Sequence, residues 1–236
     1  MHCRPWRWLA IAVALAAGST FAQAQPAASG AVRGRRSGEY RVVVSLADRR
    51  LWVLLGEDTL LAAPVAVGSS EELEYEGRRW DFDTPRGTRV VLSKTENAEW
   101  VPPDWHYVEA AATHGLRLAW LGNDRPVRLT DGRTLEVRDS TVGVVELDST
   151  FAVLPRDEEI VFDSTLFIPP LNTKNRHVAG ELGRYQLDLG DGYMLHGTPY
   201  LQSIGTASSH GCIRLRDRDV EWLYDNVPVR TRVYIY

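Results

Sequence analysis

The C-terminal part of the sequence contains His196-Gly197-Thr198 and, after ten intervening residues, Ser209-His210-Gly211-Cys212-Ile213-Arg214-Leu215. The chain has two cysteines and six histidines, and Cys212 lies in this stretch with two of the histidines. The thiolate is the reactive form of cysteine, and a free thiol with a pKa of about 8.5 is mostly protonated at neutral pH. A cysteine nucleophile therefore needs a neighbouring base, usually histidine, and this stretch predicts such a pair.

Two other roles for Cys212 have to be weighed against catalysis. A lone buried cysteine is often only a small hydrophobic residue, and cysteine can bind zinc together with histidine. The sequence lacks four ligands at the spacing of a zinc site, so we expect no metal ligands. His106, His114 and His177 have no partner at such a spacing and are expected at the surface or in the core. The residues around Cys212 favour the catalytic interpretation.

The two segments resemble the active-site signature of the L,D-transpeptidases, the family with a YkuD-type catalytic domain. An upstream motif of that family, Thr-Pro-x-Gly, is similar to Thr84-Pro85-Arg86-Gly87. The resemblance covers residues 40–91 and 180–236, and the stretch between them resembles no family. It implies a mainly β, sandwich-like catalytic domain with few helices.

The resemblance also implies roles for the residues of the signature. Cys212 would be the nucleophile and His196 its base, with the backbone carbonyl of Gly197 orienting the imidazole. Ser209 and His210 would shape the loop by hydrogen bonding.

Two further residues of the signature would contact the substrate. Gly211 would let the backbone approach the substrate, and the amides of Gly211 and Cys212 are candidate donors to an oxyanion. The guanidinium of Arg214 would either clamp a substrate carboxylate or carbonyl, or pair with Asp217 or Asp219.

The reaction that the resemblance implies is peptidoglycan L,D-transpeptidation. The thiolate attacks the carbonyl of the third residue of a stem tetrapeptide, and D-alanine leaves. An amine of a second stem peptide, a protein or a D-amino acid then resolves the thioester. No cofactor is implied, and a carbapenem, which is a β-lactam, is expected to acylate the thiol. Two alternatives stay open: a cysteine-dependent peptidoglycan hydrolase or amidase on the same scaffold, and a non-catalytic wall-binding protein.

The N-terminus predicts export. Residues 1–24 combine Arg4 and Arg7, a short apolar run and an Ala-x-Ala cleavage site, which is typical of a secretory signal peptide. The apolar run is shorter than the roughly 20 residues of a membrane-spanning helix, so after cleavage we expect no stable membrane insertion and a periplasmic location. An uncleaved anchor is the alternative. Residues 25–38, rich in Ala, Gly, Ser and Arg, are predicted to be a flexible tether.

The mature chain is expected to be mildly acidic. Cleavage removes two of the 27 Lys and Arg residues and none of the 31 Asp and Glu residues, which leaves a net charge of −6. This charge argues against nucleic acid as a partner. Cleavage also removes Cys3, so no disulfide can form within the mature chain.

The catalytic domain, residues 39–236, is predicted to be built mostly of strands. Alternating apolar runs at 41–46 and 50–55 predict a hairpin, and residues 232–236 predict a last strand. The best helix candidate, residues 220–227, has apolar side chains at helical spacing and ends before a proline.

Residues from about 93 to 175 are predicted to form a β-rich insertion. Asp131-Gly132 suits a type I′ hairpin turn. We expect the insertion to form one wall of the active-site cleft, with a remote decoration as the alternative. Residues 100–107 are either an aromatic rim for a glycan–peptide polymer or packing under a long loop. Thr84 and Gly87 are expected to be turn residues rather than reactive groups.

Overall fold

The computed structural model describes residues 39–236. The signal peptide and tether predicted for residues 1–38 therefore lie outside the described residues. In the described part, no helix is long and apolar enough to cross a membrane.

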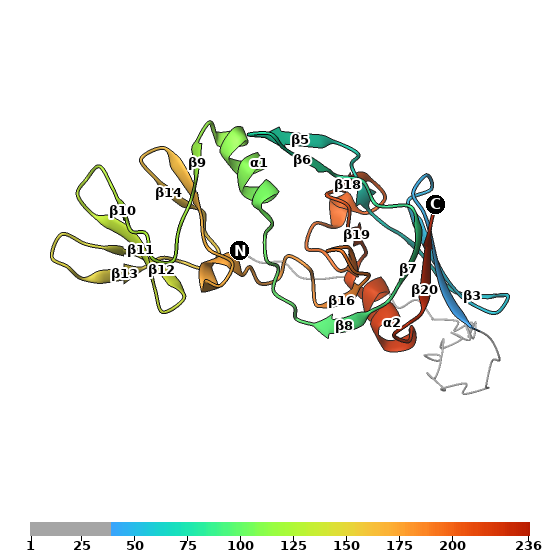
Figure 1. Ribbon diagram of the computed structural model, residues 1–236. Coiled ribbons are helices and arrows are strands. Elements are labelled where there is room, and N and C mark those ends of the chain that lie inside the picture. The colour runs from blue at the N-terminus through green and yellow to red at the C-terminus, as the bar shows by residue number, and fades with distance from the viewer. Residues whose placement is uncertain (1–38) are drawn as a thin grey trace, which may run out of the picture. The chain divides into compact units, whose positions relative to one another are not determined.

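The first sheet has the strand order β3-β2-β1-β20-β7 and joins the two ends of the described chain. It consists of β1 (Tyr40–Ser45), β2 (Arg50–Leu55), β3 (Asp58–Pro64), β7 (Gly87–Val90) and β20 (Arg232–Ile235). The hairpin predicted for the first two strands is confirmed, because β1 and β2 pair antiparallel. The predicted last strand, β20, lies between β1 and β7 and runs parallel to β1, on the right of Figure 1.

The second sheet has the order β19-β17-β16-β8 and contains the signature residues. Its strands are β8 (Ser93–Glu96), β16 (Tyr185–Asp188), β17 (Met194–His196) and β19 (Ile213–Arg214). The strand at 93–96 pairs antiparallel with β16, so it belongs to this sheet and not to the insertion expected from about residue 93. Two short pairs complete this part: β4 (Val67–Gly68) with β18 (Ala207–Ser209), and β5 (Glu72–Tyr75) with β6 (Arg78–Asp81).

One hydrophobic core joins the two sheets and helix α2 (Asp217–Asn226). Side chains such as Val42 of the first sheet and Leu195 of the second are fully buried in it, together with Leu223 of the helix. Burying such a side chain is worth about 1.5–3 kcal/mol, and this shared core holds the two sheets together. The mainly β, sandwich-like fold with few helices is confirmed, and α2 confirms the helix predicted for 220–227.

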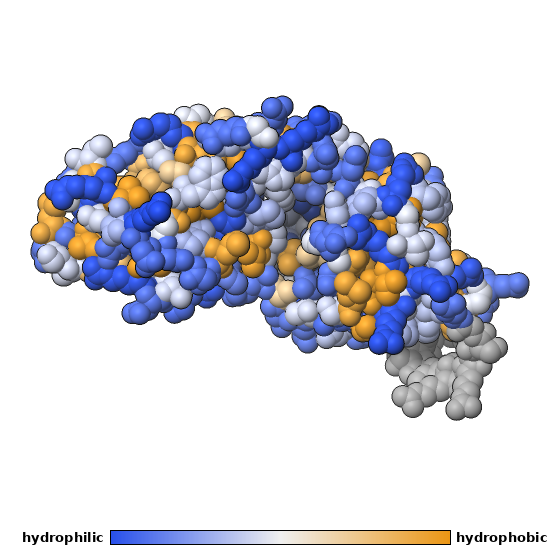
Figure 2. Space-filling model, in the orientation of Figure 1, coloured by the Kyte–Doolittle hydropathy of each residue, from blue (hydrophilic) through white to orange (hydrophobic). Residues whose placement is uncertain are grey.

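The middle segment, which we define as residues 97–184 between β8 and β16, has its own sheets and cores. One sheet has the order β10-β11-β12-β13 and the other β14-β15-β9. The strands are β9 (Arg117–Trp120), β10 (Val127–Arg128), β11 (Thr134–Arg138), β12 (Thr141–Val145), β13 (Phe151–Val153), β14 (Ile160–Phe162) and β15 (Thr165–Ile168). Figure 2 shows apolar side chains over the β10–β13 sheet, where Leu147 and Val153 are exposed, and also in the region of α2.

The turn between β10 and β11 differs from the predicted type I′ turn. A type I′ turn needs a positive φ at both central residues, but only Gly132 has one, at 91°. The Gly132 amide donates to the Leu129 carbonyl at 3.1 Å, and the Leu129 amide donates to the Arg133 carbonyl. The hairpin therefore uses a three-residue connection that ends in a left-handed glycine.

Helix α1 (Asp104–His114) was not predicted. It contacts β9 and β15 on one side and β5 on the other, as Figure 1 shows. Tyr107 and Ala111 are buried against the β14-β15-β9 sheet, while other bulky residues of the helix point elsewhere. Its apolar residues therefore form no single stripe in the sequence, which is the signal that identifies an amphipathic helix.

Arg176 fixes the start of α1. Arg176 is the last residue of the short 3-10 helix η1 (Lys174–Arg176), and its side chain is only 2% exposed. The guanidinium donates to the carbonyls of Pro102 and Pro169 at 2.7 and 2.9 Å and to the Asp104 carboxylate at 2.7 Å. All these acceptors belong to the middle segment, so Arg176 holds the helix to the rest of that segment.

Candidate active site

Strand register places the thiol and the imidazole on one face of the second sheet. Strands β17 and β19 are parallel, with Leu195 opposite Ile213 and His196 opposite Arg214. Side chains alternate along a strand, and Leu195 and Ile213 point into the core. His196 and Arg214 therefore point to the opposite face, and Cys212, which precedes Ile213, shares that face with them.

All three side chains line one cleft of about 790 Å³. The middle segment contributes Trp100, Trp105 and His106 to the lining, together with Asp157 and Glu159. This part of the chain therefore contributes to the lining of the cleft. His106, expected at the surface or in the core, lies in that lining next to the ring of Trp100.

Cys212 is half-buried, and its thiol donates to the carbonyl of Gly192 at 3.6 Å. Burial raises the pKa of this thiol, and a hydrogen bond from the Met194 backbone and the charge of Arg214 only partly oppose the effect. The resting sulfur is therefore a neutral thiol. It becomes a nucleophile only when a base removes its proton.

His196 is 5% exposed, and its Nδ1 lies 2.6 Å from the carbonyl oxygen of Gly197. A carbonyl can only accept, so Nδ1 carries the hydrogen and the neutral ring offers the lone pair of Nε2. Burial lowers the pKa of His196 to about 4, against the opposing effect of the Gly197 and Leu182 carbonyls, and the positive Arg214 lowers it further. At neutral pH the ring is uncharged and able to accept a proton.

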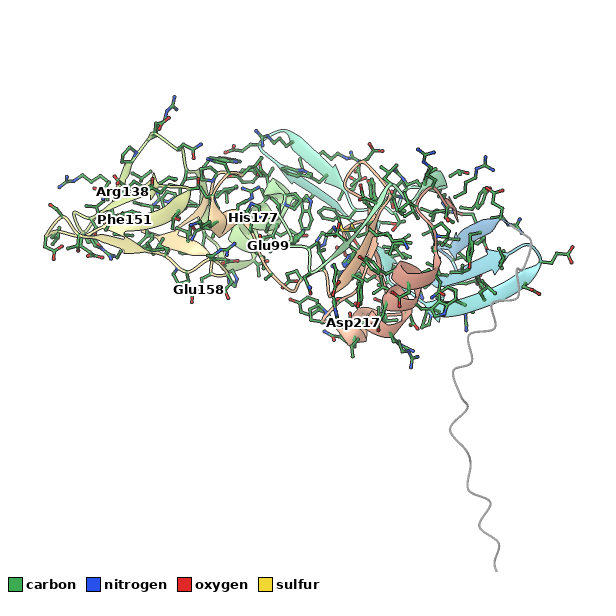
Figure 3. The ribbon with its side chains drawn as sticks, turned by 90° about the horizontal axis from the view of Figure 1, so that it is seen from below. Glu99, Arg138, Phe151, Glu158, His177 and Asp217 are labelled. Carbon is green, nitrogen blue, oxygen red and sulfur yellow. The ribbon has the colours of Figure 1, made fainter. Side chains whose placement is uncertain are left out.

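Two glycines of the signature have no room for a side chain. A Cβ on Gly197 would lie 2.4 Å from Oδ1 of Asp217, the first residue of α2, which is labelled in Figure 3. Gly211 has a φ of 112°, and a Cβ there would lie 2.8 Å from the ring of Tyr193. Larger residues would displace the base in the first case and the turn before the thiol in the second.

The loop before the thiol is held by a chain of hydrogen bonds. Ser209 is buried, and its hydroxyl donates to the Cys212 carbonyl at 2.5 Å and accepts from the Gly211 amide at 3.2 Å. That amide, one of the two expected oxyanion donors, is thus already engaged. No hydrogen bond from the Cys212 amide occurs among residues 39–236. The Cys212 amide is therefore the open donor at this turn.

Thr84 does more than form a turn. Its hydroxyl accepts from the amide of Gly68 at 2.8 Å and donates to the carbonyl of Gly211 at 2.9 Å. The side chain is buried and connects the β4 segment to the turn that carries the thiol. The sequence motif gave the position of Thr84, but its partner lies 127 residues away along the chain.

His210 is held by residues of α1. Its ring stacks on Trp105, with ring centres 4.0 Å apart and 17° between the planes, and meets the edge of Phe82. Nε2 of His210 lies 2.9 and 3.1 Å from the two carboxylate oxygens of Glu109. The sequence predicted a role for His210 in the loop but not these partners, because α1 itself was missed.

Arg214 lies in the cleft and not against α2. No ion pair of Arg214 with Asp217 or Asp219 occurs in the described part of the chain, where Asp219 pairs with Arg218 instead. Of the two expected roles, pairing with these aspartates is thus wrong. Arg214 lines the cleft together with His196 and Cys212. Within residues 39–236, no three His, Cys, Asp or Glu side chains are grouped as metal ligands.

The comparison with known families agrees with this geometry. The family model described as "L,D-transpeptidase catalytic domain" (YkuD) matches residues 39–235, nearly the whole described chain. The chain therefore belongs to the L,D-transpeptidase catalytic domain family.

Individual relatives match over shorter stretches. The Escherichia coli K12 protein "Probable L,D-transpeptidase ErfK/SrfK" is 50% identical over 54 residues, which are 23% of this chain and 17% of that protein. Its namesake from Salmonella typhimurium is 37% identical over 87 residues, 31% of this chain and 28% of that protein. The chain thus spans less than a third of the length of these relatives. An L,D-transpeptidase structure from Xylanimonas cellulosilytica matches with a TM-score of 0.44 and 16% identity, covering 86% of this chain and 62% of the other.

Proposed function

We propose that the protein is an exported peptidoglycan L,D-transpeptidase with Cys212 as its nucleophile. The observation that carries the proposal is the parallel pairing of β17 and β19, which places His196, Cys212 and Arg214 on one face in one cleft. The three side chains supply a base, a nucleophile and a cation, which acyl transfer from a peptide with a free carboxylate requires.

The acylation step begins from two neutral groups. Nε2 of His196 takes the thiol proton as the sulfur of Cys212 bonds to the carbonyl carbon of the third stem residue. The Cys212 amide donates to the oxygen on which negative charge develops. The imidazolium then gives the proton to the departing amine of D-alanine, the C–N bond breaks, and a thioester remains.

The second step regenerates the thiol. An acceptor amine attacks the thioester carbonyl and loses a proton to the now neutral His196. The C–S bond breaks, and the sulfur leaves with that proton. Because Nδ1 is fixed by the Gly197 carbonyl, the same nitrogen serves in both steps.

The cleft is lined by positive and negative side chains, which supports substrates that carry a carboxylate and an amine. Arg214 follows the thiol by two residues, lines the same cleft and would hold the terminal carboxylate of the stem peptide. Asp157, Glu159 and Glu181 also line the cleft and would attract an acceptor amine. The acceptor is a second stem peptide, a protein or a D-amino acid.

The signal peptide at 1–24, the tether at 25–38 and the catalytic domain at 39–236 with its insertion complete the proposal. Export places the enzyme where peptidoglycan is, in the periplasm. This part rests on the basic start, apolar run and cleavage site of the sequence.

The test is incubation with purified sacculi and mass spectrometry of the released muropeptides. Wild type should yield crosslinks between the third residues of two stems with loss of D-alanine, and Cys212→Ala should yield none while remaining folded. Cleaved stems without crosslinks would support the hydrolase, and binding without any product would support the wall-binding protein. A carbapenem should add one inhibitor mass to the wild type and none to Cys212→Ala.

A further inference from the structure

We propose that α1 of the middle segment is a positioning element of the active site, in which Glu109 and Trp105 hold His210 and thereby the turn that carries Cys212. This inference deepens the proposed function, because it takes Cys212 to be the reacting group.

The first argument is the number of constraints on one imidazole. His210 has Trp105 stacked on one face, Phe82 at its edge and the Glu109 carboxylate at Nε2. Trp105 and Glu109 are four residues apart in α1, so they share a face of the helix. Both residues of this helix face therefore contact the same side chain, that of His210, which precedes Cys212 by two residues.

The second argument is that α1 is itself immobilised by its own segment. Arg176 ties its N-terminus to two carbonyls and to Asp104, and the guanidinium also lies 4.8 Å above the ring of Tyr107. Tyr107 and Ala111 pack on Leu166 and Ile168. A rigid helix can hold His210 in place, whereas a loosely attached one would move with it.

The third argument is that the hydrogen bonds of Thr84 and Ser209 support the turn before Cys212 but not the His210 ring. The hydroxyls of Thr84 and Ser209 fix the carbonyls of Gly211 and Cys212. In residues 39–236 neither hydroxyl forms a hydrogen bond with the His210 ring. The contacts from α1 complete the support of the turn, which presents the Cys212 amide and sulfur to the cleft.

A substitution at Glu109 tests the positioning of His210 without altering the surface that would bind a substrate. Trp105 and His210 line the cleft, but Glu109 does not. In the folded protein, replacing Glu109 therefore removes no side chain from the cleft lining and acts on Cys212 through His210. A change at Trp105 could also alter the binding of a substrate, so Glu109 is the better probe.

The experiment measures the reaction of Cys212 with iodoacetamide and with a carbapenem, per folded molecule, and assigns each adduct by peptide mapping. Glu109→Ala should lower both rates about tenfold, because a misplaced reacting group loses much of its rate. With the carbapenem, the loss should fall on the acylation rate constant and not on the inhibitor concentration for half-saturation. Glu109→Gln, which can still accept from Nε2, should restore the rate to within about threefold.

The matched control is Glu99→Ala. Glu99 also lies in the middle segment and pairs with a histidine, His177, at 3.3 Å and with Arg156 at 3.2 Å. It lies outside the cleft lining, and its ion pairs are with His177 and Arg156 rather than with His210. Figure 3 shows Glu99 beside His177. This variant should react like the wild type.

Two results would overturn the proposal: Glu109→Ala reacting as fast as Glu99→Ala, or a loss that only follows the fraction of folded protein. Iodoacetamide needs no turnover, so this test stands even if the sacculus assay fails. Conversely, if the Cys212 thiol of the wild type did not react with a carbapenem, this would count against the proposed function. The iodoacetamide rates of Glu109→Ala and Glu99→Ala could still be compared.

Discussion

Replacing Thr84 by Val tests how the turn before the thiol is held. Valine keeps the shape of the side chain but removes the hydroxyl that joins the Gly68 amide to the Gly211 carbonyl. The Thr84 side chain is only 6% exposed, so solvent does not reach this contact to replace the hydroxyl. Both backbone groups would therefore lose their partner without replacement.

The magnitude follows from those two groups. Leaving a buried donor or acceptor unpaired costs about 1–3 kcal/mol for each group, so Thr84→Val should lower the free energy of unfolding by about 2–6 kcal/mol. Thr84→Ser keeps the hydroxyl and loses one methyl group, which costs about 1 kcal/mol. The release of the Gly211 carbonyl should also slow the alkylation of Cys212 in the valine variant.

The assay is urea unfolding at neutral pH combined with the rate of iodoacetamide alkylation of the folded protein. The serine variant is the control for packing, and the slope of the unfolding free energy against urea should stay constant. If the valine variant were as stable and as reactive as the serine variant, the Thr84 hydroxyl would have no positioning role.

Two further predictions concern buried charge. Burial lowers the pKa of His196 from its ordinary 6.5 to about 4. Between pH 6.5 and pH 4, therefore, the imidazole binds a proton in the unfolded chain but not in the folded protein. The free energy of unfolding should fall by about 3 kcal/mol as the pH falls through this range. Measured by urea unfolding across this pH range, the free energy of unfolding of His196→Gln should not show this decrease. An equal pH dependence in the wild type and in His196→Gln would contradict the lowered pKa of His196. Arg176→Met should cost about 3–5 kcal/mol, because it leaves Asp104 and two carbonyls without their buried partner. Arg184→Met removes an exposed pair with Glu96 and a guanidinium that lies over the Tyr185 ring, and it should cost less than about 1 kcal/mol. Equal losses in the two arginine variants would show that burial of Arg176 does not matter.

The sequence alone predicted those features that are written in short stretches. Cys212 and His196 stand 16 residues apart within one recognisable signature, so their chemistry could be inferred without coordinates. Strand alternation at 41–55 and helical spacing at 220–227 gave β1, β2 and α2, because one face of each element packs on the same core. The mainly β fold followed from such local periodicity and from the family resemblance.

The tertiary structure decided what depends on partners far apart in the sequence. Glu109 reaches His210 across 101 residues, and Thr84 reaches Gly211 across 127, and no local pattern encodes either contact. Helix α1 escaped prediction because its side chains are divided between the β14-β15-β9 sheet and the thiol loop. The amide of Gly211, a candidate oxyanion donor from the sequence, donates to the Ser209 hydroxyl instead. Hydrogen bonds and packing of this kind are set by how the chain folds back on itself, so they appear only when distant elements are brought together.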